Sequence, residues 1–316
     1  MSTLLVTEAS FRGLLSRAII EATVAALRPG VPLLLATDAP QAPEGFLPQP
    51  LGTLPDGVEE VVLTGVFLDR IWLDAALSTA TAAVAAGRRL RVHNLGLEDK
   101  ALGAAPRDVG VLEKAGILGL RDHRSANALT LWRINAAMRV LGYPERHVVA
   151  DATLAAMLPA GRILGLALRG RPGLADRARL PALLQRLGPA GGWSVLVLPV
   201  AGPGTADDET ATTRAAAAAL LPEAPLLLPE LAEPTIWRRE MTPARLKGLV
   251  ARCDLVLTNR DVPAAYAASC GVPVIGLLDG PDRRIASCMA TLANALAPGS
   301  ALIHLPAGDG AKGNMA

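Results

Sequence analysis

The sequence has few aromatic residues and no strong charge of either sign. Phe, Trp and Tyr together make up 3% of its 316 residues, too few for the aromatic platforms on which single-stranded nucleic acids stack. The formal net charge is +2, so the chain as a whole has no electrostatic attraction for a polyanion. We therefore expect no nucleic-acid partner.

Cysteine and histidine are also scarce. The three cysteines, Cys253, Cys270 and Cys288, are odd in number and have no metal-ligand spacing, so buried thiols are expected. The four histidines form no HxxxH or HExxH pattern, which argues against a dedicated metal site. We expect no cofactor.

Long apolar runs are missing as well, although 51% of the residues are hydrophobic and the mean hydropathy is +0.35. Gly, Pro and polar residues interrupt every stretch of the roughly 18 residues that a membrane-spanning helix needs. The first residues lack the features of a signal peptide. We expect a cytoplasmic chain without a transmembrane segment.

Short apolar runs alternate with helical patterns along the chain, which predicts an α/β protein with parallel sheets covered on both faces. The length suits two domains of about 150 residues each. The strands expected in the first half are Leu4–Thr7, Pro32–Thr37, Glu60–Gly65, Leu90–Asn94, Gly116–Leu120 and His147–Asp151. Those in the second half are Ile163–Leu168, Ser194–Val200, Pro225–Leu228, Asp254–Thr258, Val274–Leu278 and Ala301–Leu305.

The pattern restarts after a Pro/Gly break at Leu158–Gly161. We therefore predict two doubly wound, Rossmann-like domains, residues 1–158 and 162–306, which face one another across a cleft, and a frayed tail at 307–316. The helices expected between the strands are Phe11–Leu27, Leu73–Ala86, Arg107–Lys114, Ser125–Leu141, Ala178–Leu187, Asp207–Leu221, Pro243–Arg252, Val262–Cys270 and Pro281–Leu296. The loop Asp38–Pro55 is either a binding loop or a simple surface connection.

Three arginines are expected at the carboxyl ends of strands, where open α/β sheets bind ligands. They are Arg121, Arg169 and Arg260. A guanidinium suits phosphate or carboxylate. Arg121 precedes Asp122 and Ser125, which begin a helix whose free amides favour anions. As an alternative to ligand binding, Arg121 could form a structural ion pair, and Arg169 could be an ordinary surface residue.

Other polar or small residues lie beside these arginines. Gly65 is expected to end its strand and to allow a ligand close approach, or to serve as a turn. Asp151 follows a predicted strand and either binds a ligand or caps a helix. His123 is of the residue type that most often serves as a general acid or base near neutral pH, although an exposed histidine in a first helical turn explains it equally.

The order of these segments resembles the polysaccharide pyruvyl transferase family, over roughly Glu60 to Leu296. The resemblance rests on Val61–Gly65, on the RDxxS segment Arg121–Ser125, on Ala150-Asp151, on Arg169, and on Arg260 followed by Gly271-Val272-Pro273. It implies a GT-B-like fold of two Rossmann-type domains. It also implies transfer of an enolpyruvyl-derived group from phosphoenolpyruvate, as co-substrate, to a sugar of an envelope polysaccharide or exopolysaccharide.

On this resemblance Arg169 and Arg260 hold the donor, while Gly65, Arg121 and Ser125 face a sugar or lipid-linked oligosaccharide acceptor. Asp151 and Gly271 complete the expected binding residues. The family's Arg-Leu-His triplet reads Arg260-Asp261-Val262 here, so Asp261 or His123 is expected to replace the missing histidine.

Two further family features are absent. Phe11–Leu14 replaces an Asn-x-Gly-Asp-like segment, and Leu278–Pro281 lacks the usual tyrosine and lysine. Two alternatives to the transferase follow. One is an inactive relative that binds a ligand or a partner protein, and the other is a GT-B glycosyltransferase that uses a nucleotide sugar.

Overall fold

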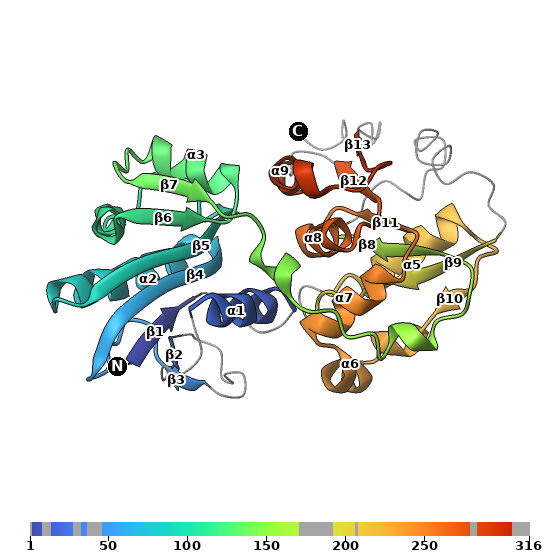
Figure 1. Ribbon diagram of the computed structural model, residues 1–316, viewed down its shortest axis with the longest axis horizontal. Helices are drawn as coiled ribbons and strands as arrows, with labels where there is room; N and C mark the ends of the chain where they lie inside the picture. The colour runs from blue at the N-terminus through green and yellow to red at the C-terminus, as the bar shows by residue number, and fades with distance from the viewer. Residues whose placement is uncertain are drawn as a thin grey trace, which may run out of the picture. The chain divides into compact units, whose positions relative to one another are not determined.

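The computed structural model describes residues 2–7, 14–27, 33–36, 46–170, 192–205, 208–278 and 283–304. The described chain forms two compact units, residues 1–145 and 146–316 (Figure 1). Each unit contains one wholly parallel sheet with helices packed on it. The α/β class and the two Rossmann-like domains predicted from the sequence are confirmed.

The sheet of the first unit has the strand order β3-β2-β1-β4-β5-β6-β7. Its elements are β1 Ser2–Val6, α1 Leu14–Leu27, β2 Leu33–Ala36, β3 Leu47–Gln49, β4 Val58–Asp69, α2 Arg70–Ala85, β5 Arg89–Lys100, the 3₁₀ helix Val109–Ala115, β6 Ile117–Leu120, α3 His123–Leu131, β7 Ala137–Val140 and the 3₁₀ helix Pro144–His147. Asp69 caps α2 by accepting hydrogen bonds from the amides of Ile71 and Trp72.

Alternate side chains of β1 pack on opposite faces of this sheet, because successive residues of a strand point in opposite directions. Leu4 and Val6 join the core formed with α2 and α3. Leu5 packs instead against Ile20 of α1. Helices on both faces of the sheet therefore explain why this strand is apolar throughout. Burial of each such side chain contributes about 1.5–3 kcal/mol to the free energy of unfolding.

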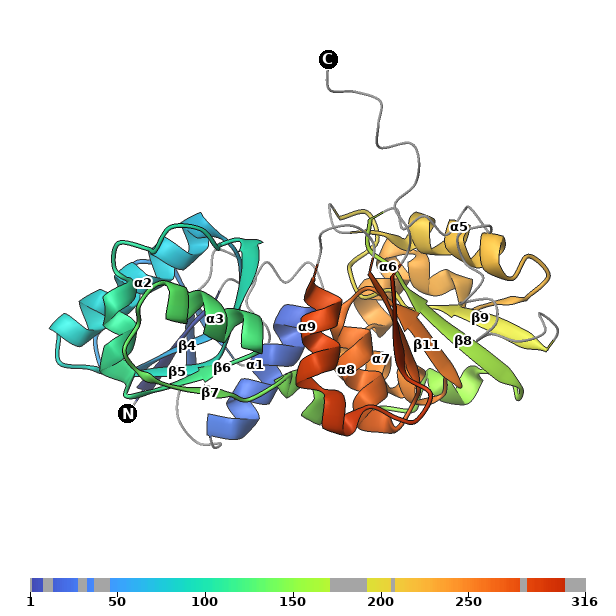
Figure 2. The same cartoon turned by 90° about the horizontal axis from the view of Figure 1, so that it is seen from above.

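The second unit has the order β10-β9-β8-β11-β12-β13. Its elements are the 3₁₀ helix Ala155–Met157, β8 Arg162–Ala167, β9 Trp193–Val197, α5 Thr210–Leu220, β10 Leu226–Leu227, the 3₁₀ helix Pro229–Ala232, α6 Pro234–Glu240, α7 Pro243–Ala251, β11 Leu255–Thr258, α8 Asp261–Cys270, β12 Val274–Leu278, α9 Arg284–Thr291, the 3₁₀ helix Ala293–Ala295 and β13 Ala301–His304. Figure 2 shows α7 and α8 on one side of this sheet and α5 on the other.

The compact units divide after Glu145, whereas the sequence places the break at Leu158–Gly161. The expected strand at His147–Asp151 is wrong, because this segment runs along α7 instead of joining a sheet. Lys247 of α7 donates hydrogen bonds from its ammonium group to the carbonyls of Arg146 and Val148. The amide of Asp151 donates to the carbonyl of Ala244.

Other predicted boundaries also differ from the structure. The expected helix Ser125–Leu141 ends at Leu131, where Arg133 adopts a left-handed backbone conformation with φ of 60°. The chain then forms β7, an edge strand that the sequence prediction missed. It also missed β3, the strand at the other edge of the sheet, which lies within the expected loop Asp38–Pro55. A left-handed C-terminal residue is usually glycine, so an arginine in that position gives no signal for the end of a helix.

Several expectations fall outside the described residues. They are the helix at 178–187, the loop residues 38–45, the segments 11–13 and 279–281, and the tail 307–316. In the described part of the chain, no helix is long and apolar enough to cross a membrane.

Candidate functional site

The carboxyl ends of β8 and β11 form the centre of the candidate site. These two strands are neighbours, but the chain goes from β8 to β9 on one side and reaches β11 on the other. This reversal of strand order opens a crevice at the carboxyl edge of a doubly wound sheet. Arg169 follows β8 and Arg260 follows β11, as the sequence predicts.

Polar side chains join the two strand ends at this edge. The amide of Arg169 donates to the side-chain oxygen of Asn259 at 2.6 Å, and the Asn259 side-chain amide donates to the Arg169 carbonyl at 2.7 Å. Thr258 donates its hydroxyl to the carbonyl of Ala167 and accepts from the amide of Arg260. This bonding fixes the backbones that carry both arginines.

Glu209 joins the two arginines to a third element, because it is the N-cap residue of α5. Arg260 Nη1 donates to Glu209 Oε2 at 2.6 Å, and Arg169 Nε lies 3.9 Å from Glu209 Oε1. The amide of Gly170 donates to the same Oε1 at 2.8 Å. The exposed side-chain fractions are 17% for Glu209, 19% for Arg260 and 42% for Arg169.

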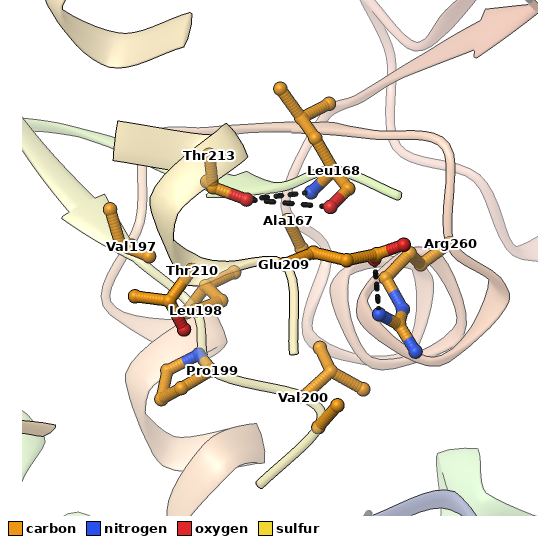
Figure 3. Close-up of a pocket in the computed structure, with 11 residues that line it drawn as sticks. Ala167, Leu168, Val197, Leu198, Pro199, Val200, Glu209, Thr210, Thr213 and Arg260 are labelled. Carbon is orange, nitrogen blue, oxygen red and sulfur yellow. Dashed lines mark hydrogen bonds and ion pairs between the residues drawn. The ribbon is translucent and has the colours of Figure 1, made fainter. Parts of the chain in front are cut away.

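Burial raises the pKa of Glu209 above its usual value, while Arg260, the Gly170 amide and Arg169 oppose that shift. The carboxylate borders a small pocket with about 10 Å³ of space, close to the minimum for one water molecule. Figure 3 shows Glu209 and Arg260 joined at one side of it. The other lining residues are Ala167, Leu168, Val197, Leu198, Pro199, Val200, Ala201, Thr210 and Thr213.

Arg121 has a different environment from Arg260. Its side chain is 2% exposed and donates two hydrogen bonds to Glu145, whose side chain is 0% exposed. The guanidinium also lies over the ring of Tyr143, 4.1 Å from its centroid. A neutralised and stacked guanidinium fits the structural ion pair that the sequence left open, although the partner is Glu145 and not the adjacent Asp122.

Ser125 and His123 lie at the start of α3. Asp122 caps this helix by accepting from the amide and the hydroxyl of Ser125, and Ser125 Oγ accepts from the amide of Leu97. Ser125 is therefore buried with its hydroxyl in use. His123 is exposed in the first unit, whereas Arg260 belongs to the second.

Two of the expected binding residues are glycines. Gly65 does not end its strand, because β4 continues to Asp69, so that expectation is wrong. Its φ is +93°, and an added Cβ would overlap with the hydroxyl of Thr7, so Thr7 occupies the space beside it. Gly271 caps the C-terminus of α8 with φ of +70°. It therefore lies at the opposite end of α8 from Arg260.

The two expected aspartates have local hydrogen-bond partners. Asp151 accepts from the amide and the hydroxyl of Thr153, which lowers its pKa, and Arg245 lies 3.2 Å away. It thus closes a turn beside α7. Asp261 begins α8 and accepts from the amide of Val262, whose own side chain is buried.

Metal and thiol chemistry receive no support from the described residues. No group of three His, Cys, Asp or Glu side chains within them is placed to hold a metal ion. Cys253 and Cys288 are buried as expected, and Cys270 is partly exposed. Burial raises the pKa of Cys253 to about 12, which keeps its thiol protonated and unreactive near neutral pH.

The sequence reasoning missed Glu209. Its local signal is the acidic run Asp207-Asp208-Glu209 before a helix, which resembles an ordinary helix start. Only the fold brings this residue to Arg260, 51 positions away in the chain.

No protein-family model matches the chain, and no curated protein matches it. Solved structures do share its fold. The UDP-GlcNAc 2-epimerase of Methanocaldococcus jannaschii is 12% identical, with a TM-score of 0.55 over 97% of this chain and 89% of that one. The UDP-GlcNAc 2-epimerase of Neisseria meningitidis, solved with UDP-GlcNAc bound, is 12% identical, with a TM-score of 0.51 over 94% of this chain and 87% of that one.

These likenesses establish a GT-B-like fold of two Rossmann-like domains. They leave the activity open, because one fold hosts many chemistries.

Proposed function

We propose that the protein binds a small anionic donor at the carboxyl edge of the second sheet and acts as a transferase of the pyruvyl transferase type. The donor is phosphoenolpyruvate, and the acceptor is a sugar or a lipid-linked oligosaccharide of an envelope polysaccharide or exopolysaccharide. The observation that carries the proposal is the pairing of Arg169 and Arg260 around one carboxylate, that of Glu209. Two guanidinium groups placed around one carboxylate suit a ligand with a carboxylate and a phosphate.

Both arginines lie where doubly wound sheets bind ligands, and their backbones are held by Thr258 and Asn259. The pocket beside them holds about one water molecule, so the donor would lie across its mouth and not inside it. In that position Arg260 stabilises the negative charge that develops on the departing phosphate.

Calorimetry with phosphoenolpyruvate tests this assignment. Arg260→Ala should weaken binding about 30-fold or more, because losing a charged, partly desolvated partner costs about 2–5 kcal/mol. Arg239→Ala is the matched control. Arg239 is an exposed arginine of α6 in the same unit, also paired with a glutamate, and its loss should change affinity less than about twofold.

Two results would contradict the proposal: no phosphoenolpyruvate binding by the unaltered protein, or equal binding by Arg260→Ala and Arg239→Ala. Circular dichroism of each variant separates a lost site from a lost fold.

A sugar-nucleotide ligand is the second candidate. It is favoured by the fold shared with a structure that contains UDP-GlcNAc, and by an acidic residue, Glu209, at a helix N-terminus on the ligand-binding edge. The same titrations with UDP and UDP-GlcNAc distinguish the two candidates. Binding of UDP-GlcNAc without binding of phosphoenolpyruvate would favour the second.

A further inference from the structure

Glu209 occupies the place that an anionic ligand of Arg169 and Arg260 would take. Its two carboxylate oxygens face two guanidinium groups and the Gly170 amide. These are the partners that a phosphate or carboxylate would use. A ligand that binds both arginines must therefore compete with Glu209.

We propose that donor binding displaces Glu209 from Arg260 and converts it into the protonated acid of the site. This inference rests on the proposed function and supplies the proton-transfer group that Val262 cannot provide. Glu209 makes no side-chain hydrogen bond to the amides of α5, so its carboxyl group is not needed as a helix cap. It is free to exchange partners without disturbing the helix.

The electrostatic balance at Glu209 gives the direction of the change. Burial already favours its neutral form, and the largest opposing influence is Arg260. When a donor anion takes over Arg260, the carboxylate loses that positive charge and gains a negative neighbour. Both changes raise a carboxyl pKa, so a proton is taken up from solvent as the donor binds.

The other charged groups of the described residues around Glu209 do not reverse this direction. Arg169, at the end of β8, would also pair with the donor. Asp208 precedes Glu209, but its carboxylate accepts from the amides of Gly204 and Thr210. Asp261 of α8 is bound to the amide of Val262. The end of β9 contributes only apolar walls, Val197 to Val200.

A protonated Glu209 completes the proton balance of ketal formation. Its proton goes to the methylene carbon of phosphoenolpyruvate, which becomes a methyl group. The first sugar hydroxyl adds to the neighbouring carbon and returns its proton to Glu209. The second hydroxyl displaces the phosphate and loses its own proton, which leaves with the phosphate as hydrogen phosphate, so Glu209 stays protonated. Pro199 and Val200 line the pocket beside Glu209 and Arg260, and apolar side chains suit the methylene group.

Proton-linked calorimetry tests the displacement. Phosphoenolpyruvate, and separately inorganic phosphate, would be titrated in two buffers of different ionisation enthalpy, into the unaltered protein, Glu209→Gln and Glu223→Gln. The difference between proteins removes the proton changes of the ligand itself. Glu223 is an exposed residue in the turn after α5, so its substitution controls for a lost surface charge.

We expect the unaltered protein and the Glu223→Gln variant to bind additional protons with each anion. The excess over the Glu209→Gln variant should be at most one proton per anion bound. Glu209→Gln should also bind the anion about tenfold more tightly, because the competing charged hydrogen bond is gone. Equal proton uptake in all three proteins, or weaker binding by Glu209→Gln, would overturn the inference.

The outcomes separate the inference from the proposed function. Binding of phosphoenolpyruvate that depends on Arg260 but shows no Glu209-dependent proton uptake keeps the function and refutes the inference. If inorganic phosphate binds with Glu209-dependent proton uptake but phosphoenolpyruvate does not bind, phosphoenolpyruvate is refuted as the donor. The displacement of Glu209 by an anion then still holds. Binding of neither anion overturns both.

Discussion

The buried pair of Arg121 and Glu145 gives the sharpest test of whether Arg121 is structural. Both side chains are almost fully removed from water, and two hydrogen bonds join them. Glu145→Gln keeps the shape of the side chain but removes its charge, and its amide group faces the guanidinium with a donor where an acceptor is needed. Arg121 would then be a buried cation that keeps only one of its two hydrogen bonds to residue 145 and no longer faces a negative charge.

Breaking a buried ion pair by removing one partner costs about 3–5 kcal/mol, because the remaining charge is left uncompensated. The ring of Tyr143 offsets only part of this, since a cation–π contact contributes about 0.5–2 kcal/mol. For a unit of this size the loss corresponds to a fall in melting temperature of about 10 °C. The double variant Arg121→Met with Glu145→Leu should recover most of that loss, because apolar pairs of similar volume replace buried ion pairs well.

Denaturant unfolding followed by circular dichroism measures the loss, and hydrogen exchange should place it within residues 2–145. The matched control is Glu60→Gln, which removes a glutamate paired with the half-exposed Arg91 and should cost less than about 1 kcal/mol. A loss in Glu145→Gln no larger than that of the control would show that water reaches the pair. Arg121 would then return to the candidates for ligand binding.

Two further predictions concern the contact between the segment 146–151 and α7. Gly248→Ala should destabilise the second unit by about 2 kcal/mol or more, because an added Cβ overlaps with the backbone carbonyl of Asp151. Thermal unfolding measures this loss, and Gly110→Ala, where an added Cβ meets no other atom, is the control. Asp151→Asn should make the free energy of unfolding less dependent on pH. Hydrogen bonds from Thr153 and the nearby Arg245 lower the pKa of Asp151 in the folded state. The stabilisation by its carboxylate is therefore present above the pKa of the unfolded state and is lost as the pH falls through the folded-state pKa. Unfolding curves for both proteins should therefore converge below about pH 4, and a constant difference down to pH 3 would contradict this reasoning.

The strands of the core were predictable because their signal is local. β8, β11 and β12 are short apolar runs bounded by turn residues, and a strand buried on both faces needs nothing else. β7 was not predictable in the same way. It alternates exposed and half-buried residues at the edge of its sheet, and the helix before it ends at Arg133 without a glycine.

The segment 146–151 shows a second limit of sequence reasoning. Its apolar residues resemble a strand, but its carbonyls are satisfied by a lysine side chain about one hundred positions later. A buried lysine is an unusual donor, because removing its charge from water is costly unless several acceptors compensate. Such a pairing is set by tertiary contacts and has no local sequence pattern.

The candidate site was predictable in part, and the comparison of two similar motifs shows why. Arg121-Asp122 and Arg260-Asp261 each follow a buried strand and begin a helix. β6 carries the first pair and lies between β5 and β7, where the strand order does not reverse. β11 carries the second and lies beside β8, where it does.

Strand order therefore separates two arginines that the local sequence cannot tell apart. At β6 the chain returns over the sheet end with Tyr143 and Glu145, which cover and neutralise Arg121. At β11 the reversal leaves the edge open, and Arg260 keeps a partly exposed guanidinium whose partner, Glu209, comes from a third element. A partner held at an open edge can be exchanged for a ligand at low cost, whereas one sealed in a core cannot. The order in which strands pair thus decides which arginine keeps a partly exposed guanidinium.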